Sequence, residues 1–87
     1  MLSFMVVCTF KPGTHMPDVF AVVQEEQAAV KKLQETGSLG AIKMAVPQGK
    51  VFIEANATDA DAATKIVASL PMAKWWDIET YLISGTA

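Results

Sequence analysis

The stretch that decides the fold is Leu70-Pro71-Met72-Ala73-Lys74-Trp75-Trp76-Asp77-Ile78-Glu79. It follows an amphipathic run, turns at a proline that cannot continue a helix, and then starts an alternating strand. It also holds both tryptophans of the chain, side by side. Because so large a side chain is costly to leave in water, a tryptophan pair at such a junction indicates a cavity wall or an interface.

The remainder of the chain alternates between strand and helix patterns. We predict strands at residues 2–10, 39–46, 51–55 and 76–83, and helices at 17–36 and 58–70. Thr58 and Asp61 form a predicted capping box at the start of the second helix. The order β-α-β-β-α-β predicts an α+β, ferredoxin-like fold, in which two helices cover one face of a four-stranded antiparallel sheet. The 87 residues are expected to form a single domain, residues 1–87.

The first strand is apolar on both faces, which predicts a second chain. Phe4 and Val6 alternate with Met5 and Val7, so both sides of the sheet need cover. Hydrophobic residues make up 52% of the chain, more than one small core requires. With no third helix to cover the second face, we expect a homodimer that packs sheet against sheet, which is a dimeric α/β barrel. Such dimers could assemble further into a larger oligomer.

Composition also excludes several classes of partner. The net charge is −2, so no basic patch exists for nucleic acid. Cys8 is the only cysteine, which excludes an internal disulfide and fits a reducing compartment. The apolar start of the chain is short and lacks a basic region, so we expect neither a signal peptide nor a membrane partner. A cytoplasmic protein is the expectation.

Glu26 is the clearest candidate for chemistry. At about 100° per residue, the first helix presents an apolar arc (Val19, Val22, Val23, Ala29, Val30, Leu33), and Glu26 projects into its middle. A carboxyl group that faces the sheet is desolvated, which raises its pKa and suits it to move protons near neutral pH. The alternative is that Glu26 turns outward or pairs with Lys43 or Lys74.

Two further residues are candidates to assist Glu26. His15, the only histidine, lies on the loop after the first strand, and Lys43 lies on the second strand. Either could stabilise an enolate oxygen, although a solvated His15 and a solvated or interfacial Lys43 are the alternatives. No residue spacing suggests a metal site, and we expect no cofactor.

Three motifs resemble the muconolactone Δ-isomerase-like family of dimeric α/β-barrel proteins. They are the starting strand 1–6, the helix end Leu33-Gln34-Glu35-Thr36-Gly37, and Leu70-Pro71-Met72 followed by Asp77-Ile78-Glu79. The resemblance covers nearly the whole chain. It implies a ferredoxin-like fold, dimers joined by their sheets, and cofactor-free movement of a double bond in a small unsaturated lactone. A glutamate of the family's first helix aligns with Glu26.

The chain departs from the family after Gly37. Where the isomerases carry basic and bulky aromatic residues, residues 38–42 are Ser-Leu-Gly-Ala-Ile, and only Lys43 is a nearby cation. A carboxylate-bearing lactone would be held poorly there. We therefore expect a more apolar substrate, of the kind that related polyketide or terpenoid isomerases and cyclases use, in contact with Phe4, Trp75, Trp76 and Tyr81.

Three functions follow from these observations. The first is a cofactor-free isomerase or cyclase that acts by proton transfer on a small, largely apolar carbonyl compound, with Glu26 as the base. The second is a non-catalytic barrel protein that binds a small apolar molecule. The third is a cofactor-free monooxygenase of the related barrel type.

Overall fold

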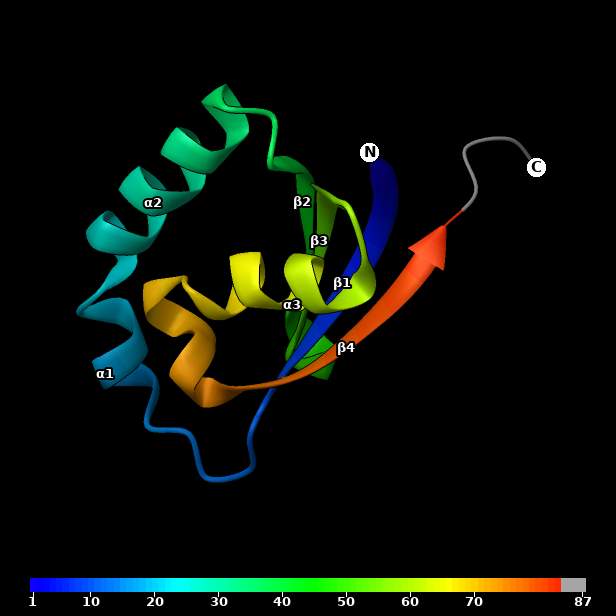
Figure 1. Cartoon of the computed structure of the whole chain (residues 1–87). Coiled ribbons are helices and arrows are strands. Elements are labelled where there is room, and N and C mark those ends of the chain that lie inside the picture. The colour runs from blue at the N-terminus through cyan, green and yellow to red at the C-terminus, as the bar shows by residue number, and fades with distance from the viewer. Residues whose placement is uncertain (84–87) are drawn as a thin grey trace.

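A computed structural model describes residues 1–83 of the chain. Its elements are β1 (Leu2–Phe10), α1 (Met16–Phe20), α2 (Val23–Glu35), β2 (Leu39–Ala45), η1 (Val46–Gln48), β3 (Lys50–Ala57), α3 (Ala60–Ala68), η2 (Pro71–Trp75) and β4 (Trp76–Ile83). The elements η1 and η2 are short 3-10 helices. Figure 1 shows α1, α2 and α3 on one side of the sheet. The predicted ferredoxin-like fold is confirmed.

The sheet has the strand order β2-β3-β1-β4, and every neighbouring pair is antiparallel. One irregularity lies in β2, where the register with β3 shifts between Leu39 and Ile42. A side chain at Gly40, inside this bulge, would place its Cβ only 2.9 Å from Glu54 Oε2 and 3.2 Å from Glu54 Cβ. Glycine therefore permits the close approach of the two strands at this point.

The core lies between the sheet and α3. Phe4, Val6 and Cys8 of β1 are at most 2% exposed, and they belong to the same buried cluster as Ala63 and Val67 of α3. Helix α3 contacts β1, β3 and β4, whereas α2 contacts β2 and η2. The centre of the sheet is thus closed by α3, while α2 lies over its β2 edge.

The predicted helix over residues 17–36 is wrong in one respect, because it is two helices. Helix α1 ends at Phe20, and Val22 (φ −110°, ψ 12°) leaves the helical region before α2 begins. Three β-branched valines, at 19, 22 and 23, surround the break, and such residues weaken a helix. Val19 is only 2% exposed, so burial of its side chain stabilises the chain at the break.

Smaller boundary predictions also change. Asp59, not Thr58, caps α3, because Asp59 Oδ1 accepts a hydrogen bond of 2.8 Å from the amide of Ala62. Strand β2 ends at Ala45, one residue before the predicted end, and η1 follows it; β3 is longer than the predicted range 51–55. Among residues 1–83, no helix is long and apolar enough to cross a membrane.

Candidate active site

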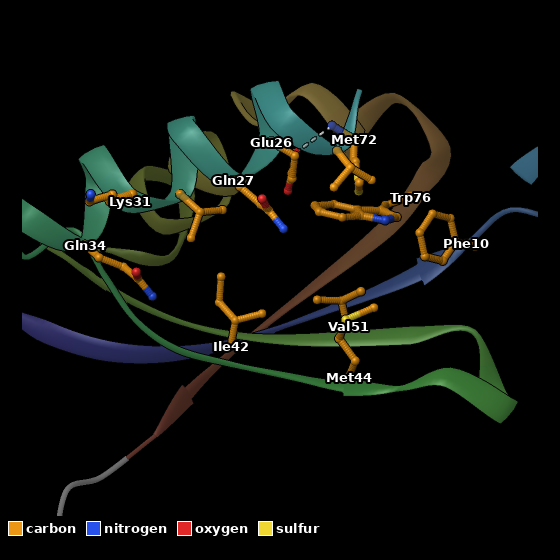
Figure 2. Close-up of a pocket in the computed structure, with 12 residues that line it drawn as sticks. Phe10, Glu26, Gln27, Lys31, Gln34, Ile42, Met44, Val51, Met72 and Trp76 are labelled. Carbon is orange, nitrogen blue, oxygen red and sulfur yellow. Dashed lines mark hydrogen bonds between the residues drawn. The ribbon is translucent and has the colours of Figure 1, made fainter. Parts of the chain in front are cut away.

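Glu26 is the buried charged residue of the described chain. It lies in the first turn of α2, and 9% of its surface is exposed. Its Oε1 accepts a hydrogen bond of 2.9 Å from the backbone amide of Met72. Figure 2 shows the other carboxyl oxygen pointing toward Trp76 and the cavity beneath α2. One oxygen is thus held by the backbone while the other faces the space in which a ligand would lie.

The Leu-Pro sequence creates the donor that holds Glu26. Pro71 starts η2, and the first hydrogen bond within this turn runs from the amide of Ala73 to Leu70 O, at 3.0 Å. The amide of Met72, one residue earlier, has no partner inside the turn because a helix leaves its first N–H groups unpaired. The decisive stretch of sequence therefore supplies the hydrogen bond to the acid on α2.

The environment of Glu26 disfavours its charge. Burial raises the pKa of the Glu26 carboxyl above its usual value, and the hydrogen bond from Met72 opposes part of that rise. The negative charge of Glu26 also affects Cys8. The pKa of the Cys8 thiol is raised to about 12, mainly by burial and in addition by the charge of Glu26. A carboxyl group in this setting can hold and release a proton nearer to neutral pH than an exposed one.

Glu26 lines a cavity of about 480 Å³ between α2, η2 and the sheet. We call it the Glu26 cavity. Its walls are mostly apolar and come from β1, α2, β2, β3, η2 and β4; they are Phe10, Val23, Glu26, Gln27, Val30, Lys31, Gln34, Ile42, Met44, Val51, Met72 and Trp76. The volume and lining are typical of a site for a small, largely apolar molecule.

Trp76 forms the wall of the cavity next to Glu26. It is 4% exposed and packs edge to face against Phe10, with ring centroids 6.1 Å apart and an interplanar angle of 78°. Its Nε1 is buried and has no hydrogen-bond partner among the described residues. Trp76 thus presents a rigid aromatic surface to the cavity, and its position at the end of η2 follows from the same Leu-Pro turn.

Two polar side chains of the cavity were missed by the sequence reasoning. Gln27 and Gln34 point from α2 toward Ile42 on β2 (Figure 2), and Gln34 Nε2 donates to the carbonyl of Gly40 at 2.9 Å. Lys31, which is outside the predicted apolar arc, also lines the cavity. The cavity runs along a flank of α2, whereas the periodicity argument considered only the most apolar arc.

The two residues predicted to assist Glu26 lie elsewhere in the chain. His15 is exposed, and its Nδ1 lies 3.3 Å from Asp18 Oδ2. Lys43 is exposed and pairs with Phe52, while its neighbours Ile42 and Met44 line the cavity. Since side chains alternate along a strand, Lys43 projects from the opposite face of the sheet. Neither residue lines the Glu26 cavity.

Of the four residues predicted to contact the substrate, one lines the Glu26 cavity and three do not. Trp76 lines the Glu26 cavity, but Trp75 does not; Lys74 Nζ lies 4.6 Å from the centroid of the Trp75 ring. Tyr81 is half exposed and donates a hydrogen bond of 2.8 Å to Glu79 Oε2. Phe4 is 2% exposed and belongs to the core. Glu26 and Trp76 are the predicted site residues that the fold brings together.

Within residues 1–83, no group of three or more histidine, cysteine, aspartate or glutamate side chains is placed to hold a metal ion. The chemistry that the cavity itself offers is one carboxyl group with a raised pKa, the side-chain amides of Gln27 and Gln34, the side chain of Lys31, and apolar walls.

Fold and site together define a class of protein. It is a ferredoxin-like α+β chain with an apolar cavity, between helix and sheet, that contains one buried acid. The family model for muconolactone delta-isomerase matches residues 2–84, and the chain belongs to that family. A search of curated proteins finds no match. The family suggests an isomerase-type protein or a related barrel protein.

Proposed function

We propose that this protein is a cofactor-free isomerase or cyclase that acts by proton transfer on a small, largely apolar carbonyl, lactone or polyketide- or terpenoid-type metabolite. The observation that carries the proposal is the Glu26 carboxyl group, buried, raised in pKa and turned toward an apolar cavity. Family membership supports isomerase-type chemistry.

In the proposed reaction Glu26 acts first as base and then as acid. Its carboxylate removes a proton from the carbon next to a carbonyl group, and the C–H electron pair moves to give an enolate. The protonated Glu26 then returns the proton to a conjugated carbon, which moves the double bond without any change of oxidation state. In a cyclase the enolate carbon attacks a second carbonyl carbon of the same molecule, and Glu26 protonates the resulting alkoxide.

We assign stabilisation of the enolate oxygen to Gln27. Its amide lines the same cavity as Glu26 and points toward the substrate space. Gln27 is exposed in the single chain, and an amide donor aimed at the enolate oxygen favours the negative oxygen of the intermediate over the neutral carbonyl. His15 and Lys43, the earlier candidates, lie outside the cavity of their own chain.

The proposal includes a homodimer formed by the open face of the sheet. Across that face the register aligns Lys43, Phe52, Val7 and Glu79. Val7 and Phe52 are half-buried apolar residues at the centre, and charges of opposite sign flank them. Such a row suits a self-complementary contact between two copies. Phe52→Asp should therefore give a folded chain with the mass of a monomer, whereas a monomeric wild type would contradict the dimer.

A cytoplasmic location is also part of the proposal. It is supported by Cys8, a buried free thiol, which fits a reducing compartment.

Glu26→Gln tests the catalytic proposal, with Glu25→Gln as the matched control, since Glu25 is the exposed neighbour on the same turn. A γ-methyl β,γ-unsaturated butenolide serves as probe, and the conjugated product is followed by ultraviolet absorption and by deuterium incorporation from D₂O. Loss of the general base should lower turnover roughly 10²- to 10⁴-fold. Glu25→Gln should keep full activity.

Full activity in Glu26→Gln would overturn the assignment. Binding of the probe with release of unchanged, undeuterated ligand by the wild type would favour a non-catalytic binding protein instead.

A further inference from the structure

A second cavity, of about 460 Å³, lies beside the Glu26 cavity. The two share four wall residues: Phe10, Val23, Met44 and Met72. The second cavity continues past these residues between α1 and the end of the β2–β3 hairpin, where Phe20 and Val46 line it. Shared walls make the two spaces parts of one cleft.

We propose that the second cavity binds the apolar tail of the substrate, so that the substrate is an elongated molecule with its carbonyl end at Glu26 and a hydrocarbon chain between α1 and the hairpin. This inference rests on the proposed function for the position of the carbonyl group. The tail-binding role itself depends on the walls of the second cavity.

Those walls are chemically suited to a hydrocarbon chain. Phe20 on α1 is 65% exposed and Val46 on the hairpin is 72% exposed. Both therefore present apolar surface to water that a ligand tail would cover. Val19 and Met16 complete the α1 side of the wall.

Charge is turned away from this part of the cleft. Lys50 is the charged residue of the second cavity, and its Nζ donates a hydrogen bond of 2.9 Å to Thr9 Oγ1. Thr9 and Lys50 are register partners on β1 and β3, one residue along from Cys8 and Val51, which face the core. The ammonium group thus lies toward the open face of the sheet. The second cavity offers an acidic tail no cation and should reject it.

Flexible side chains allow the cleft to fit chains of different shape. Met16, Met44 and Met72 all line the second cavity, and methionine adapts to irregular apolar ligands better than branched residues do. Helix α1 has only five residues, and His15 at its start makes no side-chain cap. We therefore expect selection for tail length and against tail charge, with little selection for tail shape.

The test is a series of γ-alkyl β,γ-unsaturated butenolides with methyl, propyl, hexyl and nonyl chains, whose dissociation constants are measured by calorimetry. Affinity should rise about fourfold per added methylene, the ratio that corresponds to ~0.8 kcal/mol per buried CH₂, until the cleft is full. A hexyl chain that ends in a carboxylate should not show this increase in affinity over the methyl compound.

Phe20→Asp places a charge on the wall of the second cavity and should lower the hexyl-to-methyl affinity ratio toward one. Leu82→Asp is the matched control, because Leu82 is also 65% exposed and lines neither cavity. It should leave the ratio unchanged. Turnover of the methyl probe, measured separately, reports on Glu26 and not on the tail.

Equal affinity across the wild-type series would overturn the proposal, as would a hexyl-to-methyl ratio that Phe20→Asp leaves intact. If the ratio is flat and Phe20→Asp also lowers the mass of the assembly in light scattering, a second copy of the chain covers the cleft, and the tail site is refuted. If the ratio rises but no probe turns over, the tail site stands and the catalytic proposal fails.

Discussion

Replacement of Glu26 by glutamine should change how the stability of the protein depends on pH. Glu26 is 9% exposed as a residue, and burial raises the pKa of its carboxyl group in the folded state above the value in the unfolded chain. Between these two pKa values the folded state holds a proton that the unfolded state has lost. The free energy of unfolding of the wild type therefore decreases as the pH rises through this interval.

The size of the effect is bounded by one proton. The slope contributed by Glu26 is at most ~1.4 kcal/mol per pH unit. The interval starts near the ordinary glutamate pKa of about 4.3 and ends at the raised pKa of the folded state. Glutamine has no such proton. It can still accept the hydrogen bond from Met72, although a neutral acceptor makes a bond weaker by about 1 kcal/mol than a carboxylate does.

Urea unfolding, followed by tryptophan fluorescence at fixed protein concentration from about pH 4 to about pH 8, spans the interval in which Glu26 titrates. The stability of Glu26→Gln relative to wild type should increase with pH and then level off. Glu25→Gln, at an exposed position, should follow the wild type. A difference independent of pH would refute the reasoning, because the pKa of Glu26 would then be the same in the folded and unfolded states. A difference that falls as the pH rises would also refute it, because folding would then stabilise the carboxylate.

Two further perturbations test the surroundings of Glu26. Trp76→Phe removes the buried Nε1–H that has no partner among the described residues, so relief of ~1–3 kcal/mol should offset much of the lost packing; Trp76→Ala should cost about 3–5 kcal/mol. Because both variants lose the N–H, Trp76→Phe alone tests it: in urea unfolding, a cost that reaches the ~3–5 kcal/mol of full truncation would show that loss of the N–H brings no relief and that it is bonded. The pKa of Cys8, raised to about 12, predicts that iodoacetamide modifies the folded protein at neutral pH only as fast as it unfolds. Modification as fast as that of free cysteine, measured by mass spectrometry, would contradict its burial.

Local patterns accounted for the architecture. The alternation along β1 and β4 depends only on residues that are close together in sequence, and so does the turn at Pro71. The strands and their order could therefore be predicted from sequence. The break at Ala21–Val22 was missed because the apolar period continues through it. Val19, which precedes the break, is 2% exposed, and its burial is set by the tertiary fold, which the apolar period does not reveal.

Only the part of the site that lies on a single helix could be predicted from the sequence. Glu26 stands out against the apolar period of its own helix. Its partner, the amide of Met72, is 46 residues away in the chain, and no periodicity relates the two. Whether Lys43 faces the cavity depends on which side of the sheet closes it, and His15 lies on a loop beside Asp18. Composition supplies neither position.

The central claim, that Glu26 is a buried acid with a raised pKa, can be measured directly. Carbon-13 labelling of the glutamate side-chain carboxyl groups, with NMR titration of wild type and Glu26→Gln, resolves each glutamate. One resonance, absent from the variant, should titrate above the ordinary glutamate value of about 4.3, because burial outweighs the hydrogen bond from Met72. If every glutamate titrates near the ordinary value of about 4.3, Glu26 is an ordinary carboxylate and the proposed proton transfer loses its physical basis.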